Sequence, residues 1–199
     1  MIPVASELKS LFVFSTLILV GVEFFVGPYA TLLWIPWLLF FLFIRDFHRD
    51  IPPVPLAVIS PVDGVVTSIQ HVDNPFIDQA SCCYSITQSR WGEFNMHSPI
   101  EGKVQQLWVK EHGKHKKSLV YWVRSDENDD TVVQVLLEST FQHASTALHP
   151  GERVGQGHRC GFAAVGCKVN LYLPESVKPM AGVGDTVIAG KNILGHFVH

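Results

Sequence analysis

A glycine followed directly by a cysteine, Gly166-Cys167, is the pair whose residue types favour covalent chemistry on the backbone. Glycine permits strained dihedral angles and the close approach of a neighbouring group. A thiol one residue downstream can attack the glycine carbonyl, because a thiolate is a strong nucleophile. The pair is therefore either an inert turn with a small buried residue, the usual role of a free cysteine, or a site of backbone cleavage.

Two apolar segments flank this pair and must position it. The upstream segment, residues 160–165, is apolar and strand-like. The downstream segment, residues 168–173, alternates and places Val169, Leu171 and Leu173 on one face and Lys168, Asn170 and Tyr172 on the other. This period of two predicts a β-strand, so we expect Gly166-Cys167 to lie between two strands.

The wider segment resembles the C-terminal signature of the short-type phosphatidylserine decarboxylases. The resemblance rests on Gly151-Glu152-Arg153-Val154, Gly157-His158-Arg159-Cys160-Gly161-Phe162, Val165-Gly166-Cys167-Lys168-Val169 and Leu171-Tyr172-Leu173-Pro174. In that family a Gly-Ser pair cleaves itself and the serine becomes a pyruvoyl group. Cys167 stands at the serine position, so the resemblance implies cleavage between Gly166 and Cys167 and a covalent pyruvoyl cofactor derived from Cys167. It also implies a carboxy-lyase that converts phosphatidylserine to phosphatidylethanolamine.

A cysteine at this position leaves three outcomes open, one of which is slow or no processing. Attack of the thiol on the Gly166 carbonyl gives a thioester, and elimination at Cys167 then leads to pyruvoyl and ammonia. Alternatively, water hydrolyses the thioester, which cuts the chain but leaves Cys167 as an ordinary N-terminal residue.

Two upstream motifs supply the other residues that the resemblance implies. Ser60-Pro61-Val62-Asp63-Gly64 resembles the segment whose aspartate supports the self-cleavage base, although Asp63 alone reads as a turn residue. Phe94-Asn95-Met96-His97-Ser98-Pro99 resembles the segment that supplies histidine. We favour His97 as the cleavage base, because the residues after it continue without a gap. The alternative alignment makes His97 the upstream histidine linked to decarboxylation. Many relatives carry two histidines in this segment, where the present chain carries one.

Arg159 is the candidate substrate-binding residue. Its guanidinium group is suited to a lipid phosphate or carboxylate, and an ordinary salt bridge is the alternative.

The N-terminal part of the chain is strongly apolar. Charged residues make up 17% of the sequence and the mean hydropathy is +0.22, and residues 8–44 account for this balance. Glu23, Gly27-Pro28 and Pro36 interrupt the apolar segment. We therefore expect a hairpin of two short transmembrane helices, about residues 8–25 and 29–45, and the alternative is one tilted span plus an interfacial helix.

Basic residues at both ends of this segment set the expected location. Lys9 precedes it, and Arg45 and Arg49 follow it. Both ends are therefore expected on the cytoplasmic side of the cell membrane, together with the soluble domain.

Residues 1–49 are thus expected to form a membrane-anchoring hairpin, residues 50–55 a proline-rich linker, and residues 56–199 a catalytic β domain. The domain contains two pairs of similar sequence motifs, which we call echoes. Ser60-Pro61-Val62-Asp63-Gly64 is matched by Ser98-Pro99-Ile100-Glu101-Gly102, and Gly151-x-x-Val154-x-x-Gly157 by Gly184-x-x-Val187-x-x-Gly190. Paired turns followed by β-branched residues predict a mainly β fold, a pseudo-symmetric β-sandwich like the lipoyl and biotinyl hammerhead.

Net charge and cysteine spacing limit the partners that we expect for this chain. A net charge of −3 argues against general nucleic-acid binding, and the four cysteines show no Cys-x-x-Cys spacing. The expected partners are a phospholipid substrate, the membrane and the chain's own cleaved C-terminal fragment, and a homo-oligomer is left open. Two other functions remain: a non-catalytic relative that has lost processing, and a hammerhead binding module that carries biotin or lipoate on Lys168.

Overall fold

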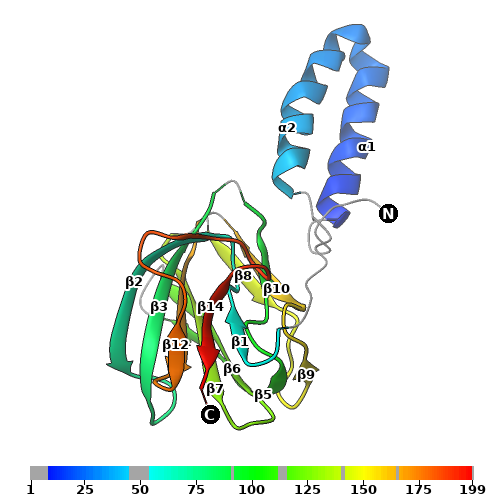
Figure 1. The fold of residues 1–199 in the computed structure, drawn as a ribbon. Coiled ribbons are helices and arrows are strands. Elements are labelled where there is room, and N and C mark those ends of the chain that lie inside the picture. The colour runs from blue at the N-terminus through cyan, green and yellow to red at the C-terminus, as the bar shows by residue number, and fades with distance from the viewer. Residues whose placement is uncertain are drawn as a thin grey trace. The chain divides into compact units, whose positions relative to one another are not determined.

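The computed structural model describes residues 9–44, 54–90, 92–111, 116–139, 142–164 and 166–198. The chain divides into two compact units, residues 1–49 and 50–199. Figure 1 shows helices in the first unit and strands in the second. The predicted linker at residues 50–53 and the basic residues 45 and 49 lie outside the described residues.

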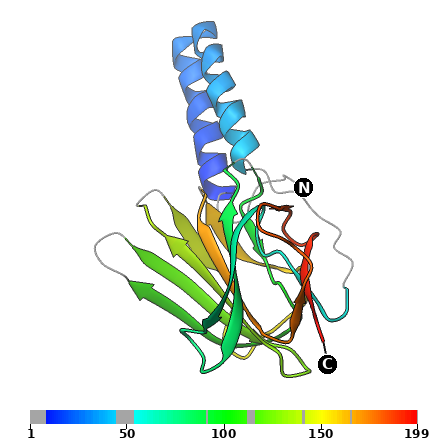
Figure 2. The ribbon, with the colours of Figure 1, turned by 60° about the vertical axis from the view of Figure 1, so that its left-hand side comes forward.

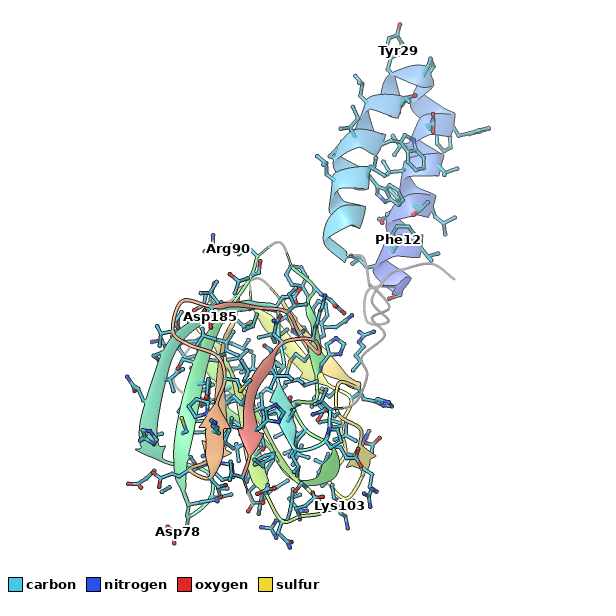
Figure 3. The ribbon with its side chains drawn as sticks, in the orientation of Figure 1. Phe12, Tyr29, Asp78, Arg90, Lys103 and Asp185 are labelled. Atoms are coloured by element: carbon cyan, nitrogen blue, oxygen red, sulfur yellow. The ribbon has the colours of Figure 1, made fainter. Side chains whose placement is uncertain are left out.

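The first unit is a helical hairpin. Helix α1 (Lys9–Val26) is followed by the 3-10 helix η2 (Pro28–Leu33) and helix α2 (Trp34–Ile44). Gly27 has a φ of 76°, a left-handed conformation that favours glycine, and the chain turns there. Tyr29 lies at the turn and is 85% exposed (Figure 3). Helix α1 lies within one residue of the prediction for residues 8–25, whereas the second predicted helix, residues 29–45, is a 3-10 helix followed by α2.

Polar side chains join the two arms of the hairpin. Glu23 accepts hydrogen bonds from Trp34 Nε1 at 3.0 Å and from Thr31 Oγ1 at 3.3 Å. Trp37 Nε1 donates to Ser15 Oγ at 3.2 Å. None of the described helices is long and apolar enough to cross a membrane, so the predicted transmembrane spans are not confirmed.

The second unit is built from strands, as the sequence predicts. Their bounds are β1 (Ala57–Ile59), β2 (Gly64–Asp73), β3 (Ala80–Gln88), β4 (Asn95–His97), β5 (Gly102–Glu111), β6 (Lys117–Arg124), β7 (Asp130–Leu137), β8 (His143–Thr146), β9 (Arg153–Val154), β10 (Arg159–Ala164), β11 (Lys168–Pro174), β12 (Val177–Pro179), β13 (Thr186–Val187) and β14 (Ile193–Phe197).

These strands form three antiparallel sheets. An eight-stranded sheet has the order β13-β2-β3-β11-β7-β6-β5-β9 and curls round, as the two views in Figures 1 and 2 show. Two three-stranded sheets have the orders β1-β14-β12 and β4-β10-β8. All three sheets contribute to one apolar core, for example through Val58, Met96 and Leu171. The mainly β prediction is confirmed.

The two sequence echoes occupy equivalent places in this arrangement. Ser60 Oγ donates to Val62 O and Ser98 Oγ donates to Ile100 O, each at 2.7 Å. After these turns, β2 and β5 begin at Gly64 and Gly102, and each pairs with a two-residue strand, β13 or β9, from the second echo. The eight-stranded sheet therefore has the same kind of edge at both ends, which explains why the motifs occur twice.

Strand β11 lies inside the eight-stranded sheet, between β3 and β7. Val169, Leu171 and Leu173 are fully buried in the main core, as their alternation predicts. On the opposite face Lys168 is exposed, whereas Tyr172 packs into a second, smaller cluster with Val120 and Val132. A strand held on both sides gives the residues just before it a fixed position.

Candidate processing site around Gly166 and Cys167

The Gly166-Cys167 pair lies where the chain passes from one sheet to another. Strand β10 belongs to a three-stranded sheet and ends at Ala164, and β11 begins at Lys168 in the eight-stranded sheet. Gly166 has a φ of +67°, and a Cβ added there would lie 3.3 Å from Arg90 Cγ. The left-handed backbone conformation therefore favours glycine at this position, and Arg90 leaves little room for a Cβ. Figure 3 shows Arg90 at one end of the β domain, with Asp78 and Lys103 at the other.

The Cys167 thiol is held in the core. The residue is 0% exposed, and its Sγ donates a hydrogen bond to Ala164 O at 3.0 Å. Burial raises the pKa of the Cys167 thiol to about 11, because desolvation disfavours the thiolate. At neutral pH the sulfur is therefore almost entirely protonated, and it must turn away from Ala164 O before it can attack a carbonyl carbon.

Gln88 clamps the cysteine from the adjacent strand. Its backbone N–H donates to Cys167 O at 2.9 Å, and its side-chain Oε1 accepts from Cys167 N at 3.3 Å. Its Nε2 donates to Ala163 O at 2.6 Å, and the residue is 2% exposed. One buried amide thus ties the residues on both sides of the crossover to the end of β3.

Gln142 contacts the carbonyl that the thiol would attack. Its Nε2 donates to Gly166 O at 3.1 Å. Its Oε1 accepts from the backbone N–H groups of Glu138 at 2.6 Å and Ser139 at 3.1 Å. Since a backbone N–H can only donate, these two contacts fix which end of the amide carries oxygen. The NH2 group is therefore directed at Gly166 O.

His97 is buried beside a carboxylate. Its Nδ1 lies 2.7 Å from Gly157 O, and its Nε2 lies 3.4 Å from Glu93 Oε1. A carbonyl oxygen only accepts, so Nδ1 carries a proton. The other ring nitrogen, Nε2, therefore faces the Glu93 carboxyl group across a long, 3.4 Å contact. Both residues are under 10% exposed, so this pair lies in a low-dielectric environment.

Asp63 is bound by the backbone. Its Oδ2 accepts from Glu93 N at 2.9 Å and its Oδ1 from Ala189 N at 2.7 Å. The carboxylate that reaches His97 thus belongs to Glu93, and Asp63 holds the backbone of that glutamate. The role predicted for Asp63, supporting the histidine, is indirect in this geometry.

The structure gathers the predicted residues into two neighbouring groups. His97 is the register partner of Arg159 across β4 and β10. The Cys167 thiol instead donates a hydrogen bond to Ala164, five residues further along β10. At about 3.3 Å per residue, the strand covers roughly 16 Å between these positions. Asp63 links the groups, because its carbonyl accepts from Ser89 N at 2.8 Å, next to Gln88. The contacts of His97 and those of Cys167 remain separate.

Three site residues escaped the sequence reasoning. Glu93 carried a usable signal, because Glu93, Asn95 and His97 share one face of an extended segment. Gln88 and Gln142 carried none, because their contacts span 79 and 24 residues of sequence.

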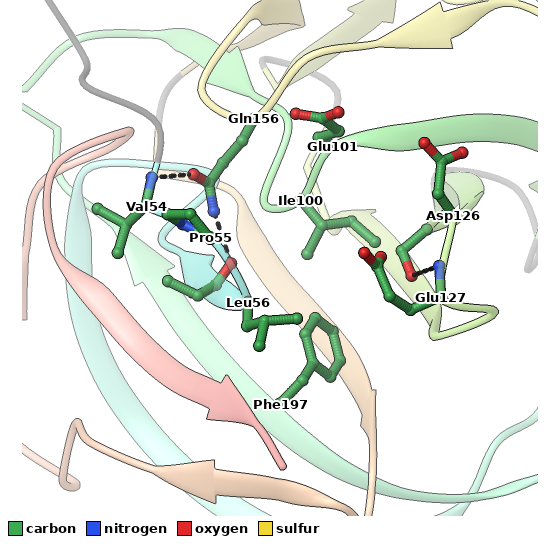
Figure 4. A pocket seen from close by; sticks show the side chains of 11 residues that line it. Val54, Pro55, Leu56, Ile100, Glu101, Asp126, Glu127, Gln156 and Phe197 are labelled. Carbon is green, nitrogen blue, oxygen red and sulfur yellow. Dashed lines mark hydrogen bonds between the residues drawn. The ribbon is translucent and has the colours of Figure 1, made fainter. Parts of the chain in front are cut away.

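A pocket of about 640 Å³ lies elsewhere in the β domain, beside Val54–Ala57 (Figure 4). Ile100, Leu56 and Phe197 give it an apolar wall, and Glu101, Asp126 and Glu127 add carboxylates. The described residues that line it include none of the predicted site residues. Because carboxylates repel an anionic head group, this pocket does not suit an acidic phospholipid.

The site thus combines a buried thiol with a preceding glycine carbonyl that an amide donor contacts, and acyl transfer uses groups of both kinds. The chain belongs to the phosphatidylserine decarboxylase family, whose model matches residues 37–195.

Three relatives carry the name phosphatidylserine decarboxylase proenzyme. The protein of Nitrosomonas eutropha is 29% identical over 187 residues, which cover 88% of this chain and 87% of the relative. The protein of Nitrosomonas europaea is 27% identical over 180 residues, or 83% of each chain. The protein of Chlorobaculum parvum is 34% identical over 183 residues, which cover 83% of this chain and 81% of the relative. No solved structure matches the chain.

Proposed function

We propose that this chain is a proenzyme that cleaves itself between Gly166 and Cys167 and then decarboxylates phosphatidylserine to phosphatidylethanolamine. The family match over residues 37–195 carries the proposal, because it includes the whole processing site. The relatives named phosphatidylserine decarboxylase proenzyme align over more than four fifths of their own length.

The residues present fit a pyruvoyl group formed at position 167. Gly166 has the left-handed φ that glycine tolerates, Gln142 contacts its carbonyl oxygen, and the thiol is shielded from water. A pyruvoyl ketone supplies an electron sink for the carbon that loses CO2. Its origin from Cys167 rather than from serine is part of the proposal.

The processing steps balance without any further reactant except water. Cys167 Sγ bonds to the Gly166 carbonyl carbon, the Gly166–Cys167 C–N bond breaks, and the thiol proton ends on the nitrogen. Loss of the α-proton of residue 167 then breaks the Cβ–Sγ bond and leaves the sulfur on Gly166 as a thiocarboxylate. Water finally replaces the nitrogen as ammonia.

We assign His97 and Glu93 to proton transfer in the decarboxylation. His97 Nε2 lies 3.4 Å from Glu93 Oε1, and Gly157 O fixes the ring through Nδ1. This assignment follows the alternative alignment, in which His97 is the histidine linked to decarboxylation. Arg159, the cross-strand neighbour of His97, is proposed to bind the phosphate or carboxylate of the lipid.

The helical hairpin is proposed to anchor the enzyme at the cytoplasmic face of the cell membrane. Its apolar side chains support this role, since Phe24, Phe25 and Leu32 are more than 70% exposed. An apolar surface of this kind is suited to lipid rather than water. The equivalent edges of the eight-stranded sheet support a hammerhead-like fold for the β domain.

The alternative functions receive less support. A lysine that carries biotin or lipoate needs an accessible hairpin tip, but Lys168 pairs with Thr87 on one side and Leu136 on the other. A non-catalytic relative would have no reason to keep an amide donor on the Gly166 carbonyl.

Intact mass spectrometry of the purified chain tests the proposal, because the position of the sulfur atom separates the outcomes. Conversion to pyruvoyl gives a C-terminal fragment that has lost sulfur and nitrogen, and this fragment should support CO2 release from phosphatidylserine liposomes. Simple thioester hydrolysis gives a fragment that begins with intact Cys167. An uncut chain, or a cut chain with an N-terminal cysteine and full activity, would contradict the proposal.

A further inference from the structure

We infer that Gln142 is a catalytic residue of the self-cleavage, in which its side-chain amide stabilises the oxyanion that forms on Gly166 O. The inference rests on the proposed self-processing and assigns one step of it to a named atom, Gln142 Nε2. The atom that this amide contacts, Gly166 O, gains negative charge during the acyl shift.

The contact is already made in the uncut chain. Gln142 Nε2 lies 3.1 Å from Gly166 O, within the range in which a donor stabilises an oxyanion. The amide is half-buried, so water screens the interaction only in part. When Sγ adds to the carbonyl carbon, the oxygen acquires a negative charge and the hydrogen bond becomes charge-assisted and stronger.

The orientation of this donor is set before the reaction. Glu138 N and Ser139 N both donate to Gln142 Oε1, at 2.6 and 3.1 Å, so the amide cannot turn its oxygen towards Gly166 without losing two hydrogen bonds. Preorganisation of this kind adds no cost of reorientation when the charge develops. A glutamine that merely tied two loops together would not need its oxygen fixed in this way.

Gln88 restrains the other half of the same peptide bond. Its Oε1 accepts from Cys167 N, the nitrogen that leaves Gly166 in the acyl shift. The two amides thus hold the scissile C=O and N–H from two separate segments of the chain. Of these two amides, Gln142 is the one that contacts the atom on which negative charge accumulates.

The balance of the assigned step is simple. The Sγ–C bond forms and the C=O π electrons move to Gly166 O. The side-chain N–H of Gln142 donates a hydrogen bond to that oxygen and keeps its proton. Collapse of the oxyanion restores C=O and breaks the C–N bond, and the nitrogen takes the proton that the thiol lost.

Gln142→Glu is the sharpest test, because it keeps an oxygen acceptor for Glu138 N and Ser139 N and replaces the donor with a second oxygen. Precursors made by cell-free translation are followed on denaturing gels with and without hydroxylamine, which cuts a thioester and leaves a Gly166 hydroxamate. We expect cleavage about 10²-fold slower than in the wild type, with and without hydroxylamine, at an unchanged melting temperature. Gln106→Glu, a change on the exposed surface of β5, is the matched control and should be cut like the wild type.

Two results would overturn the assignment. One is cleavage of Gln142→Glu at the wild-type rate, and the other is rapid cutting of this variant by hydroxylamine, which would place its defect after thioester formation. If Gln142→Glu does not fold, Gln142→Met decides in the same way, because it also lacks the donor. A wild-type chain that stays uncut would instead contradict the proposed function, and the inference would fall with it.

Discussion

The ionisation of Cys167 should control how fast the chain cuts itself. Burial raises the pKa of the thiol to about 11, so the thiolate is about one molecule in 10⁴ at pH 7 and about one in 10² at pH 9. If the thiolate is the attacking species, the cleavage rate should rise about tenfold per pH unit, or about 100-fold over this range. The described contacts of Cys167 are with Ala164 and Gln88, so no side-chain base is placed to flatten this profile.

The assay follows the C-terminal fragment after precursor made at low pH is moved into buffers between pH 7 and 9. The pKa of the Cys167 thiol is higher in the folded chain than in the unfolded chain, so the protonated thiol favours the folded state. This contribution is complete below the unfolded pKa, near 9, and is lost as the pH rises towards 11. Measurements therefore stop at pH 9, with circular dichroism at each pH as the control. A rate that is level from pH 7 upwards would refute the reasoning and would point to a neutral-pH base such as His97.

Substitutions at three further positions test other parts of the site. Cys167→Ser should cut more slowly than the wild type on denaturing gels, because a hydroxyl ionises far less readily than a thiol, and faster cutting would show that cysteine is the impaired residue. Glu93→Gln should lower CO2 release about 10²-fold while cleavage stays within about threefold of the wild type, since the carboxylate contacts His97 and not Cys167; a cleavage defect would assign the pair to processing. Asp63→Ala should lower the free energy of unfolding by about 2–4 kcal/mol in denaturant titrations, because two buried N–H groups lose their acceptor. Asp63→Asn keeps one acceptor oxygen and should lose less of the free energy of unfolding than Asp63→Ala. Equal losses for the two variants would mean that the carboxylate is not the acceptor of both bonds.

The sequence was most informative where local pattern decides structure. Alternation placed β11 and its buried face correctly, and the repeated Ser-Pro turns and Gly-x-x-Val-x-x-Gly elements predicted an internal symmetry that the structure shows as equivalent edges of one sheet. Gly27-Pro28 marked the turn between the helices. These features depend on residues only a few positions apart, where backbone preferences are strong.

The contacts of the site were less accessible because they join distant segments. The pairing of Glu93 with His97 depends on Asp63, in the turn before β2, holding the Glu93 backbone. The contact between Gln142 and Gly166 depends on how the segment after β7 returns to the start of β11. The family resemblance implied an aspartate, Asp63, as the partner of the histidine, whereas in the fold Glu93, two residues before the strand that carries the histidine, contacts it.

The arrangement also gives a physical reason for cysteine at position 167. A hydroxyl nucleophile needs a base at the moment of attack, but His97 is directed to Gly157 and Glu93. A thiol needs less help, because even at a pKa of about 11 it ionises far more readily than a hydroxyl in the same place. Gln142 already donates a hydrogen bond to the carbonyl oxygen. The greater acidity of the thiol then provides the deprotonated nucleophile that a hydroxyl would need a nearby base to form. If the chain cuts itself as proposed, a thiol at position 167 suits a site whose histidine contacts Gly157 and Glu93, and Cys167→Ser alone should not give a faster reaction.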